Sequence, residues 1–100
     1  MRMLILVYNH LLDEQIRQVL SDNDVKGYSE VPRVFGAGET GMVADSRHAP
    51  GYNCCLFAAV PEERIEPLNR EFHRLADQFA REYGRPMQLR IFSTPCEQLL

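Results

Sequence analysis

The chain has 100 residues, of which 45% are hydrophobic and 25% are charged, and it contains no tryptophan. This length fits a single domain, 1–100, and the balance is typical of a folded globular protein rather than a disordered one. The net charge of −3 argues against a nucleic-acid-binding protein, because such proteins normally carry an excess of lysine and arginine on one face.

The apolar stretch Leu4–Tyr8 near the N-terminus is too short to cross a membrane. Asn9 and His10 follow it at once, where a signal peptide would need a longer apolar region and a cleavage site. We therefore expect a cytoplasmic protein without direct membrane insertion. In that compartment its three cysteines are expected to be reduced thiols.

The first half of the chain reads as strand, helix, strand. Met3–Tyr8 is a nearly continuous apolar run, which predicts a central strand. The apolar residues between Leu12 and Leu20 fall at helical spacing, and the turn cluster Ser21–Asp24 ends this helix. Val25–Val34 has an extended pattern, and Pro32 within it lacks a backbone donor, which favours an edge strand.

The second half repeats this order. Tyr52–Val60 predicts a second strong strand. A helix over Ile65–Tyr83 is the clearest element, because its apolar residues alternate three and four apart along one stripe. Pro67 must then lie in the first turn, and Gly84 ends the helix. Met87–Phe92 alternates in the manner of a strand and is expected to be the last one.

Two strand-helix-strand units in tandem predict an α+β fold of the ferredoxin-like type, with the order βαββαβ. Right-handed crossovers place both helices on one face of a four-stranded antiparallel sheet. Residues 93–100 are left as a short tail.

The segment 36–51 between the second and third strands is unusually long for a connection between neighbouring strands. It contains four of the six glycines of the chain. Gly36, Gly38 and Gly41 permit positive φ angles and a close approach of the backbone to a ligand. The spacing matches neither a Walker A loop nor a dinucleotide fingerprint, since no Lys-Ser/Thr pair and no helix follow. The segment is either a mobile excursion or an element that binds a ligand or a partner.

Basic and aromatic residues of the strands are candidates for contacts with an anionic ligand. Lys26 and Arg33 lie on either side of the strand that leads into segment 36–51, Tyr28 lies between them, and Arg90 is in the last strand. Solvated charges on an edge strand explain the same pattern without a ligand.

A metal site would use His48, together with an acidic neighbour or a second subunit. Cys54 and Cys55 cannot join it together, because adjacent residues of a strand point to opposite faces. One of these cysteines is expected in the core and the other at a surface or interface. Glu62 and Glu63 stand at a helix start, where the helix dipole explains them, and no residue pattern requires an enzyme.

Several motifs together resemble the PII-like signalling proteins, in particular their divergent, transporter-associated branch. They are Leu4-Ile-Leu-Val-Tyr-Asn9, Val25-Lys-Gly-Tyr28, Pro32-Arg-Val-Phe-Gly-Ala-Gly38 and Pro50-Gly-Tyr-Asn-Cys-Cys-Leu-Phe57. The resemblance implies a homotrimer with its sheets facing inward and with segment 36–51 as the family's T-loop, which senses a ligand and engages a partner, often a membrane transporter.

It also implies a ligand, such as an adenine nucleotide, bicarbonate or a divalent metal, that binds between subunits at the base of this loop. On this basis the candidate ligand contacts are Lys26, Tyr28, Arg33, Gly36, Gly38, Glu39, Thr40, Arg47 and Arg90. Two alternatives remain open, namely a metal-binding regulatory protein of the same fold and a small ferredoxin-fold enzyme such as an acylphosphatase or a monooxygenase. The acylphosphatase loop after the first strand is replaced by Asn9-His10-Leu11.

Overall fold

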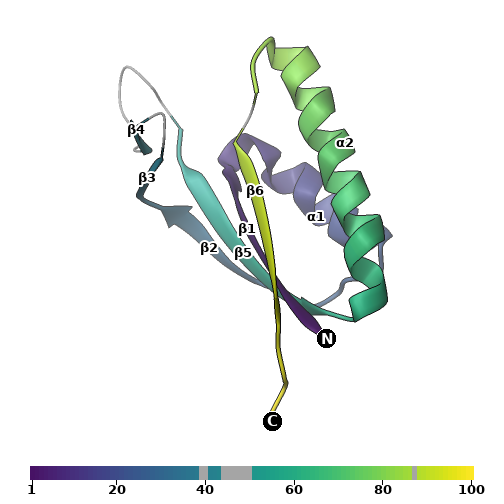
Figure 1. Ribbon diagram of the computed structural model, residues 1–100. Helices are drawn as coiled ribbons and strands as arrows, with labels where there is room; N and C mark the ends of the chain where they lie inside the picture. The colour runs from purple at the N-terminus through teal and green to yellow at the C-terminus, as the bar shows by residue number, and fades with distance from the viewer. Residues whose placement is uncertain (39–40, 44–50, 87) are drawn as a thin grey trace.

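The computed structural model describes residues 1–38, 41–43, 51–86 and 88–100 (Figure 1). One four-stranded antiparallel sheet has the strand order β2-β5-β1-β6. Its strands are β1 (Arg2–Asn9), β2 (Ser29–Val34), β5 (Asn53–Val60) and β6 (Leu89–Pro95). Two helices, α1 (Asp13–Asp22) and α2 (Ile65–Tyr83), cover the same face of the sheet. The ferredoxin-like prediction is confirmed.

Side-chain alternation divides the sheet into two unlike faces. In β1 every second residue (Leu4, Leu6 and Tyr8) is buried toward the helices. The residues between them are only half-buried and belong to the opposite face, which neither of these two helices covers. The short helices η1 (His10–Leu12) and η2 (Glu62–Arg64) lead into α1 and α2.

The core lies between the sheet and the two helices. α2 contributes its predicted apolar stripe, in which Leu68, Phe72, Leu75 and Phe79 are buried. The third residue of this helix is a proline, which the first turn tolerates because its N–H would have no helical partner there. Gly84 ends the helix with a φ of 69°, a left-handed conformation in which glycine carries no steric cost.

The strands at the two sheet edges begin or end differently from the prediction. β2 starts at Ser29 rather than Val25, although the Val25 side chain is buried in the core. β6 runs to Pro95 and so includes residues predicted to be tail, because its pairing with β1 continues as far as Arg2↔Pro95. Pro32 does lie in an edge strand, as expected.

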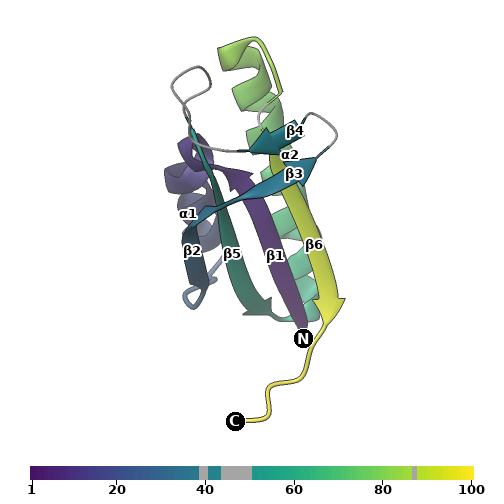
Figure 2. The same cartoon turned by 90° about the vertical axis from the view of Figure 1, so that its left-hand side faces the viewer.

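The described part of segment 36–51 is not a bare loop. β3 (Gly36–Gly38) and β4 (Gly41–Val43) pair as a small antiparallel hairpin. This hairpin lies on the open side of the sheet, away from the helices, near the start of β5 and the end of β1 (Figure 2). Gly36 is therefore in a strand, and Gly51, at the other end of the segment, has a positive φ.

Candidate functional site

Three side chains meet where segment 36–51 joins the sheet. The ring of Tyr52, just before β5, stacks on His10 with centroids 4.2 Å apart and planes inclined by 15°. The guanidinium carbon of Arg33 lies 4.2 Å from the centre of the same ring. A cation over an aromatic face is held by the electrostatics of the ring. Tyr52 thus joins β2, η1 and the start of β5 at one point.

Backbone geometry fixes this junction. The His10 N–H donates to the carbonyl oxygen of Tyr52 at 2.9 Å. Gly51 has a φ of +138°, a conformation that L side chains rarely adopt, and a Cβ built there would lie 3.5 Å from His10 Nε2. The Asn9 side chain caps η1 by accepting from the Leu11 N–H at 2.9 Å. We call the set Asn9, His10, Arg33, Gly51, Tyr52 and Asn53 the hairpin base.

Asn53 is the unusual member of the hairpin base. It belongs to the open face, because Cys54 and every second residue after it point to the helices, yet it is only 4% exposed. Its Oδ1 is buried and has no hydrogen-bond partner in the part of the chain that the structure describes. A buried acceptor without a donor costs about 1–3 kcal/mol.

The structure brings together only part of the ligand-contact set predicted from the sequence. Arg33 is in the hairpin base, and Gly36 and Gly38 form β3 directly after it. Lys26 and Tyr28 precede β2 and so lie toward its opposite end from Arg33. Arg90 is on β6, at the opposite edge of the sheet from β2. Four predicted site residues lie outside the described residues: Glu39, Thr40, Arg47 and His48.

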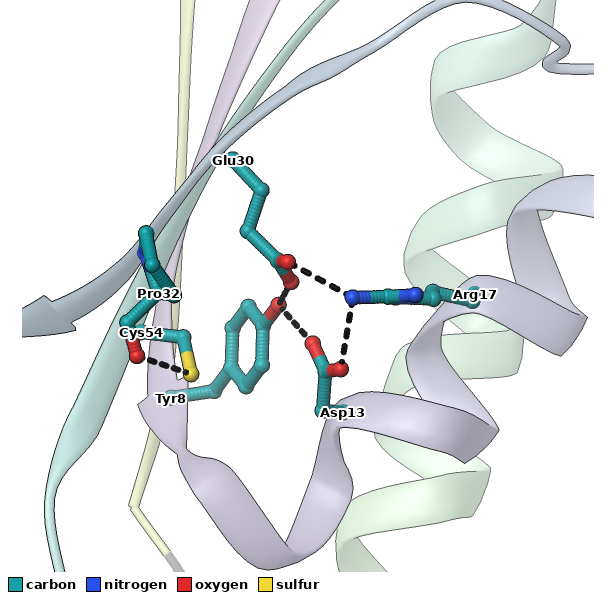
Figure 3. A network of polar contacts seen from close by, with 6 residues as sticks. All are labelled: Tyr8, Asp13, Arg17, Glu30, Pro32 and Cys54. Atoms are coloured by element: carbon teal, nitrogen blue, oxygen red, sulfur yellow. Dashed lines mark hydrogen bonds and ion pairs between the residues drawn. The ribbon is translucent and has the colours of Figure 1, made fainter.

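A second polar cluster lies on the helix side of β2 (Figure 3). The hydroxyl of buried Tyr8 is 2.6 Å from Asp13 Oδ1 and 2.7 Å from Glu30 Oε1. A phenol has one proton and can donate to only one of the two carboxylates at a time. Arg17 supplies the countercharge, since its guanidinium is 3.0 Å from Asp13 and 2.7 Å from Glu30. The cluster therefore ties β2 to α1 and β1.

The cluster shifts the protonation of its members. Burial, and then the hydrogen bonds to the two carboxylates, raise the pKa of Tyr8 far above its usual value, so the phenol stays neutral. Burial alone would raise the pKa of Asp13. Hydrogen bonding with Glu30 and Tyr8 and the charge of Arg17 outweigh it, and the pKa of this carboxyl is lowered. The charged form of Asp13 is thus the one that the fold stabilises.

Asp13 and Glu30 lie close to the thiol of Cys54, with one potential metal ligand atom from each of the three within 4.8 Å of the others. The chemistry fits a metal poorly. Burial raises the pKa of the Cys54 thiol to about 11, and this thiol donates to the carbonyl oxygen of Pro32 at 3.2 Å. Metals bind the thiolate, and both carboxylates are already ion-paired with Arg17. We interpret the cluster as a structural anchor for β2.

The open face of the sheet is apolar. Phe57 and Phe92 flank Ile5 across three strands and are 38% and 56% exposed. Val31 is 42% exposed on β2, opposite half-buried Cys55. Buried Cys54 points to the helices, so the two adjacent cysteines occupy opposite faces, as predicted. A contiguous apolar surface of this kind is typical of an interface.

Sequence reasoning misses the most distinctive residues of the hairpin base. The apolar pattern places Tyr52 in the strand itself, and His10 reads as a boundary residue. Their proximity follows from the pairing of β1 with β5 in the register Asn9↔Asn53, which no local pattern reveals. The burial of Asn53 also has no sequence signal, because asparagine in an alternating strand reads as a solvent-facing residue.

No protein-family model matches the sequence, and curated protein sequences gave no significant match. The fold itself is well represented among solved structures. CPII, a nitrogen regulatory PII-like protein from Thiomonas intermedia K12 bound to ADP, AMP and bicarbonate, superposes with a TM-score of 0.68 at 22% identity, over 93% of this chain and 84% of that one.

A DUF3240 family protein from Shewanella baltica superposes with a TM-score of 0.70 at 14% identity, covering 97% of this chain and 90% of that one. A protein of Thermus thermophilus described as PII-like gives 0.59 at 19% identity, over 93% and 83%. The chain therefore has the fold of PII-like proteins, as its sequence motifs led us to expect. Neither helix of the described residues has the length and hydropathy to span a membrane.

Proposed function

We propose that this chain is a PII-like regulatory protein that binds a small anionic ligand at the hairpin base and signals through segment 36–51. The observation that carries this proposal is the buried Oδ1 of Asn53, which has no hydrogen-bond partner among the residues that the structure describes. Asn53 is next in sequence to Tyr52, on whose ring the Arg33 guanidinium lies. Together they offer an acceptor and a positive charge in one region. A nucleotide carries both complementary groups, since its base has N–H donors and its phosphates are anionic.

The segment between β2 and β5 suits the output of such a signal. It begins at the hairpin base, and its described part projects on the open side of the sheet (Figure 2). Arg33 precedes this segment and Asn53 follows it. A ligand that contacts either residue would change the stability of the backbone conformation at that end of the segment. We propose that a protein partner, a membrane transporter in particular, reads that change, and that the chain itself catalyses no reaction.

A homotrimer is part of the proposal. The open face exposes aromatic and aliphatic side chains. Their burial in an interface stabilises the assembly by about 25 cal/mol for each Å² of apolar surface removed from water. Three copies with these faces inward would cover them and would bring Lys26, Tyr28 and Arg90 of one subunit toward the hairpin base of another. Ligand contacts that are scattered within one chain would then converge between two. The cytoplasm, where such a regulator meets the inner side of a transporter, is the proposed location.

A thermal-shift screen tests the ligand, with AMP, ADP, ATP, bicarbonate and divalent metal ions as separate probes. We expect a rise in melting temperature with at least one adenine nucleotide, because a ligand that binds only the folded state stabilises it. Light scattering of the same sample should give a trimer. A shift with metal ions alone would favour the metal-binding alternative, and no shift with any probe would contradict the ligand-binding proposal.

A further inference from the structure

The two edge strands differ in how they are protected against pairing with another chain. β2 contains Pro32, and its register with β5 shifts between Val31 and Val34. Bulges and prolines are features that keep an edge from accepting a further strand. β6 pairs with β1 in unbroken register from Leu89 to Pro95, and among the described residues no strand lies on its other side. β6 is thus the open edge of the sheet.

A groove lies beside this open edge, between β6 and α2. It consists of two hollows, of about 190 and 310 Å³, that share Asn69, Phe72 and Ile91. The smaller hollow is otherwise lined mainly by aliphatic side chains from β1 and α2, and the larger one includes His73 and Arg90. An apolar cavity of about 150 Å³ holds a benzene-sized group. The smaller hollow therefore has room for a leucine side chain.

The segment Cys96–Leu100 has the matching chemistry. It follows β6 and extends away from the body of the molecule (Figures 1 and 2), with Leu99 85% exposed and Leu100 exposed beside it. In β conformation the two adjacent leucines point to opposite faces. One would enter the groove under α2 while the other covers the open face beside Phe92, which is 56% exposed.

The segment leads away from the groove of its own subunit. The Cys96 N–H donates to the carbonyl oxygen of Met1 at 3.3 Å, so the chain continues past Pro95 in the direction of β6. Figures 1 and 2 show the segment extending from the body of the molecule along this path. A copy of the segment from another subunit can approach the groove from outside.

We infer that the groove between α2 and β6 binds the segment Cys96–Leu100 of a second copy of the chain, which adds as a strand to the open edge of β6. Strand addition of this kind supplies main-chain hydrogen bonds for affinity, while side-chain pockets give specificity. The inference requires self-association but not the binding of a ligand at the hairpin base, and the two can fail separately.

Cross-linking between different chains tests this inference. Chains carrying only Asn69→Cys are co-expressed with chains carrying only Leu99→Cys, and the purified mixture is oxidised. We expect a disulfide between positions 69 and 99, identified by mass spectrometry of the linked peptides and absent from the wild-type protein treated in the same way. If only the double variant Asn69→Cys/Leu99→Cys forms this bond, and forms it within a single chain, the inference is overturned.

Assembly measurements provide the second test. Leu99→Asp and, on the groove side, Asn69→Trp should each raise the subunit dissociation constant at least tenfold in sedimentation equilibrium. Leu11→Asp is the matched control, because Leu11 is also an exposed leucine, 44% accessible, but lies on η1 outside the groove. Its dissociation constant should stay within twofold of the wild type. Equal dissociation constants for all three variants would contradict the inference.

Discussion

The two faces of the sheet are built from the same strands but are stabilised in different ways. On the helix side, Leu6, Tyr8 and Leu56 are fully buried, and the one polar group among them is hydrogen-bonded to Asp13 and Glu30. On the open side, aromatic residues are partly exposed, and a buried asparagine oxygen is unpaired among the residues that the structure describes. The polar groups that meet on the helix face are paired within one chain, whereas the open face exposes apolar side chains and holds a buried acceptor without a donor among the described residues.

This difference separates the residues that stabilise the fold from those that we propose to bind other molecules. A face that satisfies its own apolar and polar groups can hold the fold without help. A face that leaves such groups unsatisfied carries a cost, which a binding partner can remove. The comparison predicts that changes on the helix side reduce the stability of the monomer, while changes on the open side affect assembly and ligand binding more than folding.

The largest effect is expected in the core. Phe72 of α2 is fully buried, and its replacement in Phe72→Ala removes apolar contacts and leaves a cavity. Such truncations cost about 3–5 kcal/mol, a large part of the stability of a small domain. Urea unfolding monitored by circular dichroism should show this loss. A loss below about 1 kcal/mol, far under the usual range for such truncations, would mean that the helix side is not the principal core.

An open-face variant should weaken assembly instead. Phe57 lies in the middle of the open face and pairs with Ile5 and Ser29 across the neighbouring strands. Burial of such a side chain contributes about 1.5–3 kcal/mol, so Phe57→Ser should raise the dissociation constant of the oligomer about tenfold to a hundredfold. Sedimentation equilibrium measures it.

Tyr83→Ser is the control for this change, because Tyr83 is a similarly exposed aromatic residue, 51% accessible, on α2 outside the sheet. Its oligomer should dissociate as the wild type does. If both variants assemble equally well, the open face is not the subunit interface.

The polar cluster should give the helix side a pH dependence. Because the folded pKa of Asp13 lies below its ordinary value of 3.8, its stabilisation is fully present above that value and is lost as the pH falls through the folded pKa. Asp13→Asn should cost about 1.5 kcal/mol at pH 7, the low end for a hydrogen bond to a charged group. The difference from wild type should disappear in acid.

Urea titrations between pH 7 and pH 2 measure this difference, with Asp77→Asn on the exposed side of α2 as the control. The control should parallel the wild type throughout. A difference for Asp13→Asn that stays constant down to pH 2 would contradict the proposed role of its charge.

The smallest effect on folding is expected at Asn53. Leucine has nearly the same shape, and Asn53→Leu removes the buried acceptor that lacks a donor among the described residues. The variant should be as stable as the wild type or up to about 1 kcal/mol more stable in the absence of ligand, since unsatisfied acceptors carry a cost. Thermal unfolding without and with ADP should then show a lost ligand shift. A strongly destabilised variant would mean that the Asn53 side chain serves the fold.

Much of this comparison could be predicted from the sequence. The nearly continuous apolar run Met3–Tyr8 indicated a central strand, and the stripe of Ile65–Tyr83 indicated the helix that packs on the sheet, because local hydrophobic patterns reflect burial directly. The end of β6 at Pro95 could not be predicted, since it depends on how far β1 extends beside it. The stack of Arg33, Tyr52 and His10 and the burial of Asn53 depend on strand register, which joins residues far apart in the chain.

Calorimetric titration with ADP tests the central claim, that the hairpin base binds an anionic ligand, most directly. The wild type should bind one ADP per subunit, and Arg33→Ala should bind at least tenfold more weakly, because it removes the positive charge over Tyr52. Arg74→Ala, which removes an exposed arginine of α2 paired with Glu71, should bind as the wild type does. Equal affinity of Arg33→Ala and wild type, or no binding of ADP by either, would contradict the account.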